Sequence, residues 1–138
     1  MAITNLELIT DALREINVIN EVQSASAEQG TQCLKKLNQL MEIWKEDSLN
    51  IGWFKQTDTS ADAPVPDYAE TAVMLALGVR AAPQYGASIS VEYAAALTMA
   101  LKVLRRKLIV EGLDNTDMTH LPEGTGHWGS RYNITSDT

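Results

Sequence analysis

Residues 26–47 read SAEQGTQCLKKLNQLMEIWKED and carry the clearest structural signal in the chain. Ser26 and Gln29 have the spacing of a capping box, in which each side chain accepts a hydrogen bond from the other residue's backbone N–H at a helix start. Apolar residues then recur every three or four positions, which is the spacing of one buried helical face: Cys33, Leu34, Leu37, Leu40, Met41 and Trp44. The stretch therefore predicts a long amphipathic helix whose intervening polar residues, Asn38 included, face water.

The same rules predict two further helices on either side of this stretch. Thr4 and Glu7 have the spacing of a second capping box, so a helix begins at residue 5, and its periodicity ends near Ile16. Toward the C-terminus, Pro66 precedes an alanine-rich helical stretch that we expect to stop at Pro83. A proline lacks the backbone N–H and disfavours helical geometry in the residue before it.

The longest periodic run predicts a fourth helix. Ser88 or Ser90 caps its start, and it ends before Gly112. Because the four apolar stripes are no larger than a four-helix core requires, we expect no large exposed apolar face and a predominantly monomeric free chain. The stripe of the fourth helix is expected to contain Val91, Ala94, Ala95, Leu97, Thr98, Leu101, Leu104, Leu108 and Ile109.

Two segments lack helical periodicity. Residues 48–66 form a long internal loop, and loops of this length are usually functional or mobile. Residues 113–138 are polar, with scattered apolar residues that cannot build a core. The sequence therefore predicts an all-α, four-helix domain over residues 1–112, followed by an extended C-terminal arm over residues 113–138.

Composition limits the class of protein. The chain has 138 residues, a formal net charge of -7 and a single cysteine, which excludes a disulfide scaffold. An acidic balance disfavours nonspecific attraction to DNA phosphates. The sequence has neither a basic, apolar leader nor an apolar run long enough to span a bilayer, so we expect a soluble cytoplasmic chain with no membrane partner.

Nothing in the sequence points to catalysis or to a cofactor. His120 and His127 have no further histidine or cysteine at metal-ligand spacing, so no metal is expected. Cys33 lies on an apolar stripe and is expected to pack rather than to react. Pairs such as Glu46 and Asp47 occur by chance among eighteen acidic residues. We therefore expect a protein that is not an enzyme.

The C-terminal arm contains the strongest candidate binding residues. Aromatic and arginine side chains dominate the energetics of protein interfaces, and small residues between them let a strand follow a surface. The candidates for docking on another chain are His127, Trp128, Arg131, Tyr132 and Leu121. The alternative is that they fold back onto their own helices.

A second candidate interface combines the internal loop with a basic cluster. Trp53 and Phe54 are large aromatics in the loop. Lys102, Arg105 and Arg106 belong to a basic cluster, completed by Lys107, near the end of the fourth helix. Cations at a helix C-terminus are favoured by the helix dipole, so a solvated face explains the cluster as well. Contact with an acidic partner or with phosphates is the alternative.

Four segments, taken in order, resemble a known family. They are DALREINV at residues 11–18, LNQLMEIW at 37–44 continuing to Ile51–Gly52, AAPQYG at 81–86 and LPEGTG at 121–126. In this pattern of packing and turn residues the chain resembles the head-to-tail adaptor proteins of tailed phages, especially the tail accessory (head-completion) proteins of short-tailed phages. The resemblance covers most of the chain.

The resemblance implies a role in virion assembly. Such proteins bind the portal protein as a ring of about twelve copies, extend the DNA channel, help retain packaged DNA and present a platform for the next tail component. The arm would reach along the portal, with Trp128, Arg131 and Tyr132 as anchors. The protein would then be found at the head–tail junction of the virion, and in the host cytoplasm during assembly.

An acidic ring agrees with this role, because it lets DNA pass through the lumen without specific binding. Two alternatives remain open. A DNA-packaging or DNA-binding subunit would use the basic cluster around Lys102. Some relatives are also credited with peptidoglycan hydrolysis, which is a minor alternative because the family pattern singles out no carboxylate pair in this chain.

Overall fold

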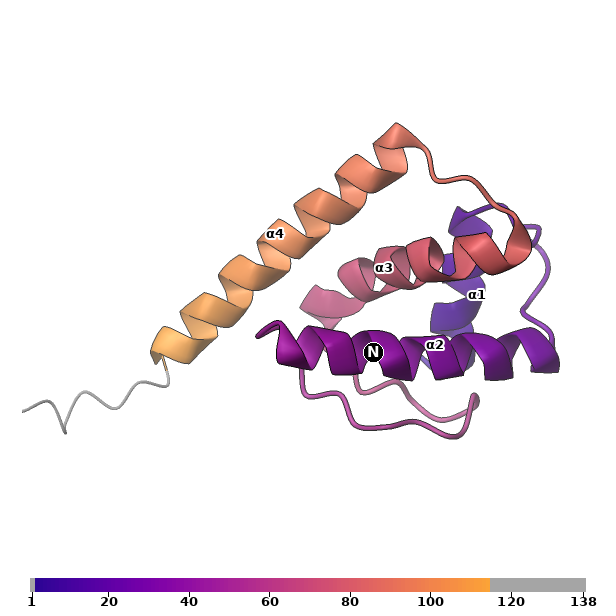
Figure 1. The fold of residues 1–138 in the computed structure, drawn as a ribbon. Helices are drawn as coiled ribbons and strands as arrows, with labels where there is room; N and C mark the ends of the chain where they lie inside the picture. Colours follow the sequence, from indigo (N-terminus) through magenta and orange to yellow (C-terminus); the bar gives the residue numbers. More distant parts are fainter. Residues whose placement is uncertain (1, 115–138) are drawn as a thin grey trace, which may run out of the picture.

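A computed structural model describes residues 2–114 of the chain, and the side chains of residues 2–110 (Figure 1). Within these residues the fold has no strand, and its one β-bridge joins Thr4 to Asp62. The predicted all-α, four-helix architecture is therefore confirmed. The helices are α1 (Asn5–Glu15), α2 (Ala27–Glu46), α3 (Asp67–Tyr85) and α4 (Val91–Asp114).

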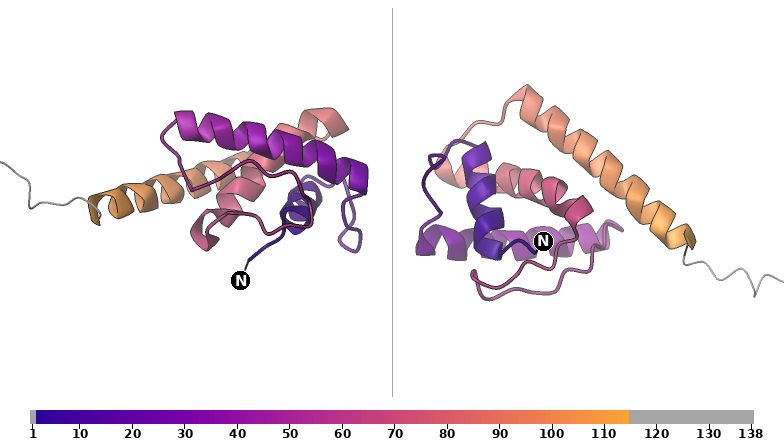
Figure 2. Two further views of the ribbon diagram at one scale, coloured as in Figure 1. Left: turned by 90° about the horizontal axis from the view of Figure 1, so that it is seen from below. Right: turned by 180° about the vertical axis from the view of Figure 1, so that it is seen from behind.

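Helix α3 is the centre of the fold. It contacts each of the other three helices, and α1 and α2 also contact each other. Helix α4 contacts only α3 among the described helices, and it extends beyond the cluster formed by the other three (Figures 1 and 2). The fully buried large side chains come from all four helices: Leu8, Ile9, Leu13, Leu37, Leu77, Leu104, Val73, Asn5 and Cys33.

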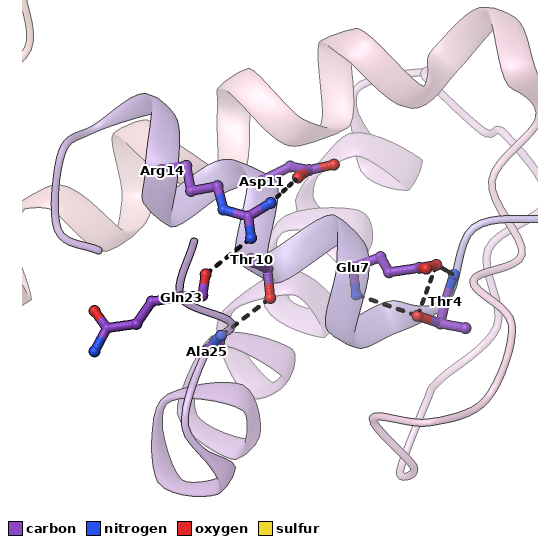
Figure 3. A network of polar contacts seen from close by, with 7 residues as sticks. All are labelled: Thr4, Glu7, Thr10, Asp11, Arg14, Gln23 and Ala25. Carbon is purple, nitrogen blue, oxygen red and sulfur yellow. Dashed lines mark hydrogen bonds and ion pairs between the residues drawn. The ribbon is translucent and has the colours of Figure 1, made fainter. Parts of the chain in front are cut away.

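Both predicted capping boxes are present. Thr4 Oγ1 accepts a hydrogen bond from the backbone N–H of Glu7 at 3.2 Å, and a carboxylate oxygen of Glu7 accepts from the backbone N–H of Thr4 at 2.9 Å (Figure 3). Ser26 and Gln29 make the same reciprocal pair. These bonds satisfy backbone donors that a helix start leaves without a partner, which explains why α1 and α2 begin where the sequence predicts.

The predicted end of α3 at Pro83 is wrong, because the helix continues through this residue to Tyr85. Gly86 adopts a left-handed conformation with φ 66°, and the N–H of Ala87 donates to the carbonyl of Ala82 at 3.0 Å. This bond and the left-handed Gly86 are the features of a Schellman motif, which satisfies the last carbonyls of the helix. Pro83 is exposed, so the single missing backbone hydrogen bond lies on the solvent side of the helix.

The predicted end of α4 is also wrong, since the helix continues through Gly112 to Asp114. A glycine is permitted inside a helix at a cost of about 1 kcal/mol relative to alanine. A glycine near a helix end therefore marks a frequent stop, not an obligatory one.

Hydrogen bonds hold the internal loop over residues 48–66 against the helices. The side-chain amide of Asn5 is completely buried and donates to the carbonyl of Asp58 at 2.9 Å and to Gln56 Oε1 at 3.1 Å. Asn38 donates to the carbonyl of Gln56 at 2.8 Å, and the N–H of Leu6 donates to the loop at the Thr59 carbonyl. Asn38 is thus half-buried and does not simply face water as predicted.

Thr10 fixes the connection between α1 and α2. Its side chain is buried, and its Oγ1 accepts a hydrogen bond from the backbone N–H of Ala25 at 3.1 Å (Figure 3). Arg14 reinforces the connection by donating to the carbonyl of Gln23 at 2.9 Å. These two hydrogen bonds therefore hold the segment between α1 and α2 against α1, and Ala25 is buried in the core.

Thr10→Val is expected to lower the free energy of unfolding by about 1–3 kcal/mol, because the buried N–H of Ala25 loses its acceptor while the shape of the side chain is kept. Urea unfolding followed by circular dichroism measures the change. Thr98→Val is the matched control, since Thr98 is exposed and its hydroxyl donates only to Ala94 in its own helix. Equal effects of the two substitutions would contradict the role assigned to Thr10.

Candidate interaction surfaces

Helix α4 carries more apolar surface than the fold covers. Leu104 is its one fully buried described side chain, and Tyr93, Leu97, Ala100, Leu101 and Leu108 pack partly buried against the core. Several predicted members of the buried stripe are instead exposed, so that prediction is wrong for these: Val91, Ala94, Ala95, Thr98 and Ile109. Among the described helices only α3 packs on α4, and one neighbouring helix covers only one stripe of a helix.

The exposed apolar residues of α4 include one regular stripe. Met99 is 62% exposed and Val103 is 55% exposed, and both lie away from the stripe that contacts α3. Spacings of three and four residues place them on one side of the helix, at the heptad positions typical of helix–helix contacts. We define the outer face of α4 as Ala96, Met99, Val103, Arg106 and Val110. This face contradicts the expectation that no large apolar surface is exposed.

One contact fixes the position of α4 on α3. The hydroxyl of Tyr93 donates to the carbonyl of Leu75 at 2.7 Å, and a β-carbon on Gly78 would overlap that hydroxyl. Burial, with a smaller contribution from Glu15, raises the pKa of Tyr93 to about 12. The hydroxyl therefore stays protonated at neutral pH and keeps its donor role, and the missing side chain of Gly78 makes room for it.

The four residues of the predicted basic cluster lie on α4, and two of them have partners on other elements. Arg105 reaches Asp47 at 3.5 Å, and the Lys107 ammonium lies 5.7 Å from the centroid of the Tyr68 ring. Lys102 and Arg106 make no ion pair with any residue that the structure describes. They lie one turn apart beside the apolar residues of the outer face, so that face is both apolar and basic.

A groove of about 820 Å³ runs along α1 and the start of α3. Ile3 and Leu6 supply the apolar part of its lining, and we call it the acidic groove because four carboxylates surround it: Glu7, Asp11, Asp67 and Glu70. The cation in its lining is Arg14, which pairs with Asp11 at 3.3 Å (Figure 3). Hydrogen bonds from the backbone and side chain of Thr4 lower the pKa of Glu7, so this carboxylate stays ionised at neutral pH.

The acidic groove does not follow from the periodicity of the sequence. Asp67 and Glu70 stand about sixty residues from Glu7 and Asp11 in the chain and meet them only because α1 packs against α3. The acidic first turn of each helix is a local signal, but it says nothing of their proximity.

The aromatic residues of the internal loop have different surroundings. The indole N–H of Trp53 donates to Asn38 Oδ1 at 3.1 Å, and the half-buried ring lines a groove of about 680 Å³ beside α2. Phe54 is 65% exposed. The second candidate interface, which combines this pair with the basic cluster on α4, stays a prediction.

The candidate residues of the C-terminal arm lie outside the described residues: Leu121, His127, Trp128, Arg131 and Tyr132. Their role in docking stays a prediction from the sequence.

Within the described residues, no group of three histidine, cysteine or acidic side chains is placed to hold a metal ion. Cys33 is buried, and this burial raises the pKa of its thiol. Its sulfur lies 3.9 Å from the hydroxyl of Tyr85, whose pKa is raised to about 12 chiefly by burial. Cys33 therefore packs as predicted. In the same part of the chain, no helix is long and apolar enough to cross a membrane.

No protein-family model matches the chain, and no curated protein is significantly similar to it. What the protein does must therefore follow from its surfaces. Among the described residues, the outer face of α4 combines apolar area with positive charge, and the acidic groove combines apolar area with four carboxylates and the one cation Arg14.

Proposed function

We propose that this protein is a head-to-tail connector of a tailed phage. It binds the portal protein as a ring of about twelve copies, extends the DNA channel, helps retain packaged DNA and attaches the next tail component. It acts at the head–tail junction of the virion after synthesis in the host cytoplasm. The role is one of assembly, without catalysis and without a cofactor.

The outer face of α4 is the observation that carries the proposal. A helix of 24 residues that contacts a single one of the described helices leaves apolar side chains exposed, and such surfaces mark sites of protein interaction. An assembly protein buries this surface when it meets its partners. The resemblance of the four sequence segments to head-to-tail adaptors supplies the class of partner.

The net charge of -7 supports the same role. A ring of acidic copies has a strongly negative lumen, which repels DNA phosphates and lets the genome pass without adhering.

The proposal is tested by mixing the full chain with its cognate portal protein and separating the complexes by sedimentation. We expect the chain to sediment with the portal, and electron micrographs to show an added ring at one end of the portal. The chain alone and the portal alone are the controls. Absence of co-sedimentation at micromolar concentrations of both proteins would refute the proposed function.

A DNA-binding or DNA-packaging subunit is the second candidate, and the exposed Lys102 and Arg106 are the observation that favours it. Two cations are few for this purpose, since affinity for DNA grows with the number of phosphates neutralised. Arg105 and Lys107 already have partners within the chain. Retention of DNA by the purified protein that falls steeply with salt would favour this candidate over the connector.

A further inference from the structure

The outer face of α4 and the acidic groove are complementary in charge and in apolar content. The outer face presents Met99 and Val103 beside Lys102 and Arg106. The acidic groove presents apolar lining from Ile3 and Leu6 beside its four carboxylates. We propose that the outer face of α4 docks in the acidic groove of a second copy of this chain, and that this head-to-tail contact joins neighbours in the ring. The assignment to the ring rests on the proposed function.

The geometry of one copy leaves both surfaces open to a neighbour. Leu97, Leu104 and Leu108 lie on the side of α4 that packs on the core, so the outer face points away from it. Helices α1 and α4 both contact α3 but not each other, and α4 extends away from the other helices (Figure 2). A contact between two different surfaces is heterologous, and repetition of such a contact produces a ring when the rotation closes.

The distribution of charge favours a second copy as the occupant. Residues 2–90 hold twelve acidic and six basic residues, whereas residues 91–110 hold one acidic and four basic residues. Two outer faces packed on each other would bring like charges together, which disfavours a symmetric pair of α4 helices. A basic, apolar helix in an acidic, apolar groove brings opposite charges together and buries the exposed side chains.

Charge reversal on each surface tests the contact. One double variant, Lys102→Glu with Arg106→Glu, makes the helix acidic. The other, Asp67→Lys with Glu70→Lys, makes the groove basic and leaves the capping residue Glu7 and the paired Asp11 unchanged. Sedimentation equilibrium of the full-length chains, at about 0.01–1 mM and at low ionic strength, measures self-association.

We expect the natural chain to self-associate in this range and each double variant to do so at least tenfold more weakly. An equimolar mixture of the two variants should recover the association. The acidic helix of the first variant fits the basic groove of the second, and the unchanged basic helix of the second fits the unchanged acidic groove of the first. Lys35→Glu with Lys45→Glu, an equal reversal on exposed positions of α2, is the control and should leave the association unchanged. Circular dichroism checks that every variant keeps its helices.

Three results would overturn the inference: a natural chain that stays monomeric at 1 mM, a groove variant that associates as the natural chain does, or a mixture that recovers nothing. A groove variant with undiminished association beside a weakened helix variant would place the partner of the outer face of α4 outside the acidic groove. Co-sedimentation of the natural chain with the portal tests the proposed function and not the contact between copies. Its loss would refute the proposed function, whereas a monomeric natural chain that still binds the portal would refute only the contact between copies.

Discussion

Replacing Trp128 by alanine is expected to abolish ring formation on the portal. It is the single large aromatic between residues 94 and 131, and Gly126 and Gly129 beside it let the side chain enter a pocket. Truncating a buried aromatic anchor costs about 2–4 kcal/mol, which is roughly 30-fold to 1000-fold in affinity at one site. Coupling between the copies of a ring multiplies this loss. Co-sedimentation with the portal measures it.

The free protein should melt as the natural chain does, because the buried core that the structure describes is formed by residues between Leu8 and Leu104. Met118→Ala is a matched control, since it removes another apolar side chain from the arm outside the candidate set, and portal binding should persist. A Trp128→Ala protein that melts several degrees lower but still binds the portal would show that Trp128 packs on its own helices. The docking-arm interpretation would then be wrong.

Leu104→Ala should lower the free energy of unfolding by about 2–5 kcal/mol, the range for large-to-small substitutions in a core. Leu104 is completely buried, and the other described contacts of α4 with the core come from half-buried side chains. Removing it leaves a cavity where α4 meets α3 and weakens the anchoring of the whole helix. Urea unfolding at low micromolar concentration measures the change before self-association contributes.

Met99→Ala is the matched control on the same helix, because Met99 is 62% exposed. Its effect should stay within about 0.5 kcal/mol, as for most surface substitutions. A similar decrease in the free energy of unfolding for the two variants would mean that Leu104 does not anchor α4 to the core. A Leu104→Ala chain that keeps its stability but loses portal binding would assign that side chain to an interface instead of the core.

The outer face of α4 could be predicted only in part from sequence patterns. The basic residues of α4 were recognised as a cluster, because they are neighbours in the chain. The predicted core stripe included Val91 and Ile109, which are largely exposed, and it left out Met99 and Val103 of the outer face. Periodicity identifies a residue as apolar and helical, but it does not say whether a second helix is present to cover it.

The sequence by itself determined the four helices and the starts of α1 and α2, because capping boxes and apolar stripes depend on residues no more than a few positions apart. The tertiary structure alone decided how much of the predicted stripe of α4 is buried and that Asn5 holds the internal loop. It also brought Glu70 beside Asp11. Each of these depends on which elements pack together, and packing is set by contacts between residues distant in the chain, which no local pattern encodes.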